Sequence, residues 1–92
     1  MKEFKVGDGF AYCPGNEVYF LKITKIGRWN KDKKCKSITF NRYLYENNVC
    51  KEDKYETGKA LIVRDESKNK EYVQIDHWLT KKYCVRHIVY CE

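Results

Sequence analysis

EVYFLKITKI, residues 17–26, is the stretch of this 92-residue chain that decides its fold. It is dense in β-branched and aromatic residues, and apolar side chains recur on one face at a period of two, as in a half-buried strand. The residues on that face are Tyr19, Leu21 and Ile23. The alternation breaks after Ile23, so we expect a bulge or bend near Thr24 and Lys25.

Two hairpins can be read outward from this strand. Residues 36–41 alternate again, with Ile38 and Phe40 on the inward face, and pair with residues 17–26. Residues 59–64 and 71–75 form a second hairpin, because both are rich in β-branched residues and a polar tip joins them. The sequence therefore predicts an antiparallel sheet.

The remaining segments are less regular. Residues 4–12 read as a short strand with a Gly-containing interruption, and residues 42–58 fit neither period, so a long loop with a short helix is expected there. Asp76 is expected to cap a single helical turn at residues 77–82. Residues 83–90 then form the last strand.

This order of elements resembles the SH3-like barrel superfamily. The matching pieces are the opening Phe4-Lys5-Val6-Gly7-Asp8, the long loop after residues 17–26, the polar hairpin tip at residues 65–70, and the single turn at residues 77–82. The resemblance implies a mainly β fold: a small antiparallel five- or six-stranded SH3-like barrel, with one short helical turn before the last strand, in one domain over residues 1–92.

The chain departs from signalling SH3 domains. Their acidic loop and the Pro-Ser-x-Tyr segment before the final strand are missing from the sequence, so binding of Pro-rich peptides is not implied. Nucleic-acid-associated members of the superfamily with a Val-Gly-Asp opening look nearer.

Positive charge is concentrated in one stretch. Residues 20–45 carry a net charge of +7, so the rest of the chain carries −1 and the whole chain +6, and Trp29 lies within this stretch. Lysines neutralise phosphates and an indole ring offers a stacking surface, so a polyanion such as a nucleic acid or a nucleotide is the expected ligand. The candidate ligand-binding residues are Lys25, Arg28, Trp29, Lys31, Lys33, Lys34, Lys36 and Arg42. The scarcity of Arg disfavours sequence-specific base reading.

Two roles are open for Trp29. It either stacks on a base or folds back to cap one end of the barrel, with the lysines solvating the loop. If the terminal strand lies beside the basic hairpin, Lys81, Lys82 and Arg86 extend the basic patch.

A second candidate surface lies in the irregular segment. Exposed tyrosine is enriched at protein interfaces, and Tyr43, Tyr45 and Tyr55 are flanked by acids, so they form a possible partner surface. The acids are Glu46, Glu52, Asp53 and Glu56.

The cysteines and histidines do not form a recognisable site. Cys84, His87 and Cys91 have metal-like spacing, but Cys84 and His87 point to opposite faces of a strand and no Cys-x2-Cys pair completes the set. We therefore expect no metal, no cofactor and no catalytic residue. The N-terminus has no apolar run typical of a signal peptide and no segment is long enough to span a membrane, so free thiols, a cytoplasmic location and no membrane partner are expected.

Two functions remain open from the sequence. The first is a non-enzymatic module that binds a polyanion through the basic hairpin. The alternative is a small phage- or mobile-element-type protein that binds and inhibits or modulates a larger protein partner. The sequence leaves the oligomeric state undetermined.

Overall fold

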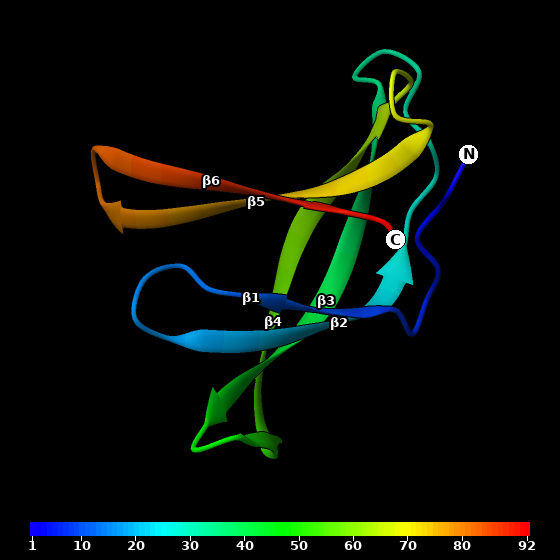
Figure 1. Ribbon diagram of the computed structural model, residues 1–92. Coiled ribbons are helices and arrows are strands. Elements are labelled where there is room, and N and C mark those ends of the chain that lie inside the picture. Colours follow the sequence, from blue (N-terminus) through cyan, green and yellow to red (C-terminus); the bar gives the residue numbers. More distant parts are fainter.

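The computed structural model describes residues 1–52 and 55–92 in full atomic detail. The strands form one sheet in which each strand pairs antiparallel with the next along the chain, and this sheet curls into a half-barrel (Figure 1). The strands are β1 (Gly9–Tyr12), β2 (Val18–Ile26), β3 (Cys35–Glu46), β4 (Val49–Asp65), β5 (Lys70–Thr80) and β6 (Tyr83–Tyr90). The predicted mainly β, antiparallel fold is confirmed.

The core lies on the inner, concave face of the curled sheet. Along β2 and β3 the side chains alternate, so that Leu21, Ile23, Ile38 and Phe40 are buried as predicted. Strands β4 and β5 continue this face, and Phe4 from the N-terminal segment packs onto it. The core residues are Phe4, Tyr12, Leu21, Ile23, Ile38, Phe40, Ala60, Ile62, Val73, Ile75 and Cys91.

The predicted bulge in β2 is confirmed. Lys22 pairs with Asn41 and Ile23 with Phe40, but the next paired residue is Lys25, opposite Thr39. The extra residue, Thr24, donates its hydroxyl to the carbonyl of Thr39 at 3.2 Å. The inserted residue bends the strand, which helps the sheet to curl.

The expectation of a long loop with a short helix at residues 42–58 is wrong. β3 continues to Glu46 and β4 begins at Val49, with only Asn47 and Asn48 between them. Both asparagines have positive φ, 52° and 60°, which is the backbone of a tight two-residue hairpin turn. The register shifts between Tyr43 and Tyr45, so the side-chain alternation that would have revealed the strands is interrupted.

The expected helical turn at residues 77–82 is also wrong. β5 continues to Thr80, and its hydroxyl oxygen accepts hydrogen bonds from the backbone N–H groups of Lys82 and Tyr83 at 3.2 and 3.1 Å. Asp76, the expected helix cap, instead lies opposite Arg86 on β6 and accepts its Nε–H at 2.8 Å. Cross-strand pairing therefore takes the groups that a helical turn would have used.

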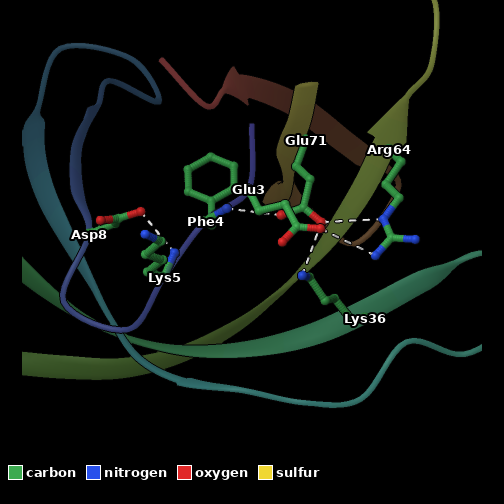
Figure 2. Close-up of polar contacts among 7 residues, drawn as sticks. All are labelled: Glu3, Phe4, Lys5, Asp8, Lys36, Arg64 and Glu71. Carbon is green, nitrogen blue, oxygen red and sulfur yellow. Dashed lines mark hydrogen bonds and ion pairs between the residues drawn. The ribbon is translucent and has the colours of Figure 1, made fainter. Parts of the chain in front are cut away.

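A buried carboxylate ties the N-terminal segment to the sheet (Figure 2). The Glu71 side chain is fully buried, and its Oε1 accepts the backbone N–H of Phe4 at 2.9 Å. Its Oε2 lies 3.0 Å from Lys36 Nζ and 3.5 Å from Arg64 Nε. The backbone of Glu71 also bonds to Lys2 and to Cys91, so one residue holds both ends of the chain.

The first and last strands lie at the two edges of the sheet. The order of strands runs from β1 to β6 without joining them. A cleft of about 490 Å³ lies between these edges and is lined from both sides by residues that include Phe10 and Val89. The half-barrel is thus open along this side. Within the described part of the chain there is no helix of the length and apolarity needed to cross a membrane.

Candidate functional site

The basic loop between β2 and β3 is an ordered turn rather than a solvated tail. Its ends are fixed by backbone hydrogen bonds from Gly27 to Ser37 and from Asn30 to Cys35, both 2.8 Å. The Asn30 side-chain oxygen accepts the N–H groups of Asp32 and Lys33, each at 3.0 Å. An Asn side chain that bonds to the backbone ahead of it is a common way to close a loop. The loop therefore holds Trp29 in a defined position.

Trp29 is half-buried and lies against the end of β4, next to the β4–β5 turn. The guanidinium carbon of Arg64 lies 4.1 Å from the centre of the Trp29 ring. This is cation–π distance, and Arg64 also lies 3.5 Å from Glu71 and 3.6 Å from Glu3. Arg64 therefore covers one side of the indole and links the loop to the buried carboxylate.

A groove of about 820 Å³ opens beside Trp29. Its lining residues include members of the basic loop and of the segment around the β4–β5 turn. These two segments lie close together at the top of Figure 1. The groove is lined by Trp29, Lys31, Lys34, Val63, Arg64, Asp65, Glu66, Tyr72, Ile88 and Tyr90. We refer to it as the Trp29 groove. Three aromatic rings and three cationic side chains thus share one open hollow with two acids.

Strands β5 and β6 supply the aromatic floor of the groove. The rings of Tyr72 and Tyr90, which are cross-strand partners, lie 5.3 Å apart. Lys68 Nζ lies 4.2 Å from the centre of the Tyr90 ring, and the Tyr90 hydroxyl donates to Asp65 at 3.1 Å. Hydrogen bonds from Ser67 first, and then from Tyr90, hold the pKa of Asp65 below its ordinary value. These contacts fix the floor before any ligand arrives.

The structure does not bring all the predicted ligand-binding residues to one place. Trp29, Lys31 and Lys34 line the Trp29 groove. Arg28 and Lys33 are exposed on the same loop without lining it. Lys25 is exposed on β2, where it lines a smaller hollow with Ser37, Thr39 and Lys59.

Two of the predicted cations have other partners. Lys36 belongs to the inner face, and its side chain is 11% exposed and paired with Glu71. Arg42 pairs with Glu56 and lies over the Tyr19 ring at 4.6 Å. Neither side chain joins the basic loop, because alternation along β3 places both on the face opposite to Ser37 and Thr39.

The candidate tyrosine surface is partly assembled. Tyr43 and Tyr55 are cross-strand partners with ring centres 5.7 Å apart. Tyr45, two residues after Tyr43 on β3, is exposed. Glu46 lies at the nearby turn, where it pairs with Lys51. Glu52 is exposed on β4. The side chain of Asp53 lies outside the described residues.

Lys81 and Lys82 do not extend the basic loop. They form the turn between β5 and β6, which lies at the far end of that hairpin from the basic loop (Figure 1). Arg86 is occupied by Asp76. Only the end of β6, with Ile88 and Tyr90, reaches the Trp29 groove.

The cysteines and histidines do not gather into a metal site in the described residues. All five cysteines are free thiols. His77 and His87 both lie against Tyr12, with ring centres 6.3 and 5.1 Å away. Burial raises the pKa of Tyr12 and that of the Cys91 thiol. These groups form part of the inner face and its rim.

Sequence reasoning missed three residues of the Trp29 groove, Arg64, Tyr72 and Tyr90. It also missed Lys59, which lines the smaller hollow beside Lys25. The first three come to Trp29 through the pairing of β4, β5 and β6, and Lys59 reaches Lys25 across β3. Their only signal in the sequence is their place in predicted strands.

No protein-family model matches the chain, and searches of curated proteins and of solved structures also find no match.

Proposed function

We propose that this chain is a non-enzymatic module that binds a polyanion, a nucleic acid or a nucleotide, in the Trp29 groove. The observation that carries the proposal is the presence of Trp29, Lys31 and Lys34 in one open groove with an aromatic floor. Ammonium groups on the rim attract phosphates, and an aromatic ring binds a base of any sequence by stacking. The finer resemblance to nucleic-acid-associated SH3-like barrels is part of this proposal and is supported by the curled antiparallel sheet.

Trp29 fluorescence provides a direct test. The chain has two tryptophans, and Trp78 lies on the outer part of the β5–β6 hairpin, away from the groove. In a Trp78→Phe variant, an unlabelled oligonucleotide of mixed sequence is expected to quench the remaining Trp29 emission at low salt. In the matched Trp29→Phe variant, Trp78 emission is expected to stay unchanged.

Substitutions on the rim test the electrostatic part. Lys31→Glu with Lys34→Glu is expected to weaken binding at least tenfold, about 1.4 kcal/mol or more. Lys81→Glu with Lys82→Glu makes the same change in net charge at the distant turn and is the control. Equal losses in both variants, or no oligonucleotide binding at low salt, would refute the proposal.

A second function is favoured by a different observation. The β5–β6 turn exposes large apolar side chains, with Trp78 63%, Leu79 52% and Tyr83 56% exposed. Exposed aromatic side chains are typical of protein-binding hot spots. This surface supports the alternative of a small phage-type protein that binds and inhibits or modulates a larger protein in the cytoplasm, where the free cysteines would stay reduced.

The alternative has its own readout. A stoichiometric protein retained by the wild-type chain is expected to be lost with Trp78→Ser and Tyr83→Ser, while oligonucleotide binding stays unchanged. Retention that survives both substitutions would remove the support that the exposed turn gives.

A further inference from the structure

The outer face of β3 carries a line of small polar side chains. Ser37, Thr39 and Asn41 alternate along the strand with the buried Ile38 and Phe40, so they point away from the core. Each has a hydroxyl or amide group that can bind a phosphate oxygen or a sugar. This line begins next to Cys35, whose cross-strand partner Val63 lines the Trp29 groove.

Lysines flank the line on both sides. Thr39 pairs with Lys25 on β2 and with Lys59 on β4, and Asn41 pairs with Lys22. Two strand spacings place the backbones of Lys25 and Lys59 about 9.5 Å apart. Between them is a hollow of about 230 Å³ that Ser37 and Thr39 also line. In segments 22–25, 37–41 and 57–61 every charged side chain is a lysine.

Aromatic side chains lie at the other end of the line. Tyr43 and Tyr55 are cross-strand partners, and the Asn41 amide donates to the Tyr43 hydroxyl at 3.3 Å. Phe20 is the β2 partner of Tyr43, and Tyr55 is 56% exposed. The outer face therefore has aromatic groups at both ends and a purely cationic, hydroxyl-lined middle.

We propose that a single-stranded nucleic acid runs along the outer face of β3, from the Trp29 groove over the Lys25–Lys59 hollow to Tyr43 and Tyr55. This inference rests on the proposed function and assigns its ligand class and path. From Cys35 to Tyr43 the strand rises about 26 Å. That length accommodates several nucleotides, in keeping with sites of about 4–16 nucleotides on other single-strand-binding domains.

The chemistry of the surface favours a single strand. Rings at the two ends bind bases that are free to turn their faces to the protein, whereas bases in a duplex are stacked on one another. The flanking cations are lysines, which act as point charges on phosphates and do not read bases bidentately. The surface is therefore expected to bind with little sequence preference.

The test measures fluorescence anisotropy of labelled mixed-sequence oligonucleotides of 4 and 12 nucleotides and of a 12-base-pair duplex. Lys25→Glu with Lys59→Glu is expected to weaken binding of the 12-nucleotide strand at least tenfold relative to Lys81→Glu with Lys82→Glu. A Lys25→Gln, Lys59→Gln variant is expected to lower the slope of log K against log salt concentration by about 1.4, for two lost phosphate contacts.

The tyrosine end has a matched control. Tyr55 and Tyr83 are each 56% exposed, and Tyr83 lies at the distant β5–β6 turn. Tyr55→Ser is expected to weaken binding of the 12-nucleotide strand about fivefold or more and to leave the 4-nucleotide strand unaffected when that strand is held at the Trp29 groove. Tyr83→Ser is expected to change neither. Circular dichroism and urea unfolding establish that each variant is folded.

The outcomes distinguish failure of the proposed path along β3 from failure of the proposed function. If Trp29→Ala abolishes binding but the Lys25 and Lys59 variants match their control, the proposed function holds and the path along β3 is wrong. If no oligonucleotide binds at low salt, both fail. Tighter binding of the duplex than of the 12-nucleotide strand would overturn the single-strand assignment.

Discussion

The inner and outer faces of β3 and β4 are made by alternate residues of the same strands, yet they differ in almost every property. On the inner face, the side chains of Ile38 and Ile62 are at most 1% exposed. Outward, their neighbours Ser37 and Leu61 are exposed to solvent. The inner face therefore provides most of the stability, because burial of apolar surface is the main favourable term in folding. The outer face can carry charge for binding at little cost to the fold.

Glu71 is the exception that sharpens this comparison. It is a carboxylate on the inner face, buried completely and surrounded by Lys36, Arg64 and the Phe4 N–H. Arg42 and Glu56 are cross-strand partners on β3 and β4 and also form an ion pair, but the Glu56 side chain is 73% exposed. A carboxylate thus forms an ion pair with a basic side chain once shielded from solvent, at Glu71, and once in contact with solvent, at Glu56.

Glu71→Gln is expected to have the largest effect. Removing one partner of a buried pair leaves Lys36 and Arg64 with uncompensated charge, which typically costs about 3–5 kcal/mol. Urea unfolding at neutral pH measures the loss. Glu56→Gln, at the exposed pair, is the control and is expected to cost at most about 1 kcal/mol. Similar losses for the two variants would show that the buried carboxylate is not an anchor.

A pair of neighbouring residues tests the two faces directly. Ile62→Ala opens a cavity in the core and is expected to destabilise the fold by about 2–5 kcal/mol. Leu61→Ala removes a side chain that is 38% exposed on the outer face and is expected to cost about 1 kcal/mol or less. Chemical denaturation of both variants gives the difference. A larger loss for Leu61→Ala would mean that the outer face is covered in solution.

Two glycines test how rigid each face is. A Cβ at Gly58 would lie 2.6 Å from the ring of Phe40, which is buried, so Gly58→Ala is expected to cost about 1–3 kcal/mol by overpacking. A Cβ at Gly9 would lie 2.3 Å from the tip of the Phe20 ring, but that ring is 37% exposed and can swing away. Gly9→Ala is therefore expected to cost less than Gly58→Ala, as measured by thermal unfolding. The reverse order would contradict the assignment of the faces.

The smallest effect is expected at Asp65, beside the Trp29 groove. Because its pKa in the folded chain is lowered, its contribution to stability is present above the ordinary carboxyl pKa of 3.8 and is lost as the pH falls through the lower folded value. Asp65→Asn should therefore lower the stability slightly at neutral pH and flatten its loss in that acidic window, so that the variant and the wild type converge at the lowest pH. Urea midpoints measured across the acid range provide the check, and an unchanged acid dependence would contradict it.

The sequence predicted the strands whose alternation is regular and failed where a local irregularity hides the period. Residues 17–26 and 36–41 were placed correctly because Leu21, Ile23, Ile38 and Phe40 alternate with polar residues. The register shift beside Tyr43 concealed the long β3–β4 hairpin. At Asp76, a residue that commonly caps helices pairs across the sheet, and local propensity gives no sign of that partner.

The candidate site divides in the same way. Trp29, Lys31 and Lys34 could be found from sequence because they lie in one short charged loop. The roles of Lys36 and Arg42 could not be found from sequence. Strand alternation sets the face on which each side chain lies, and Glu71 and Glu56 are the carboxylates with which they form ion pairs. The sequence by itself determined an antiparallel β fold and a concentration of positive charge, since both follow from local order along the chain. Only the tertiary structure decided that Arg64 covers Trp29 and that Lys25 and Lys59 flank one strand, because these contacts join residues that meet through the pairing of β2, β3, β4 and β5.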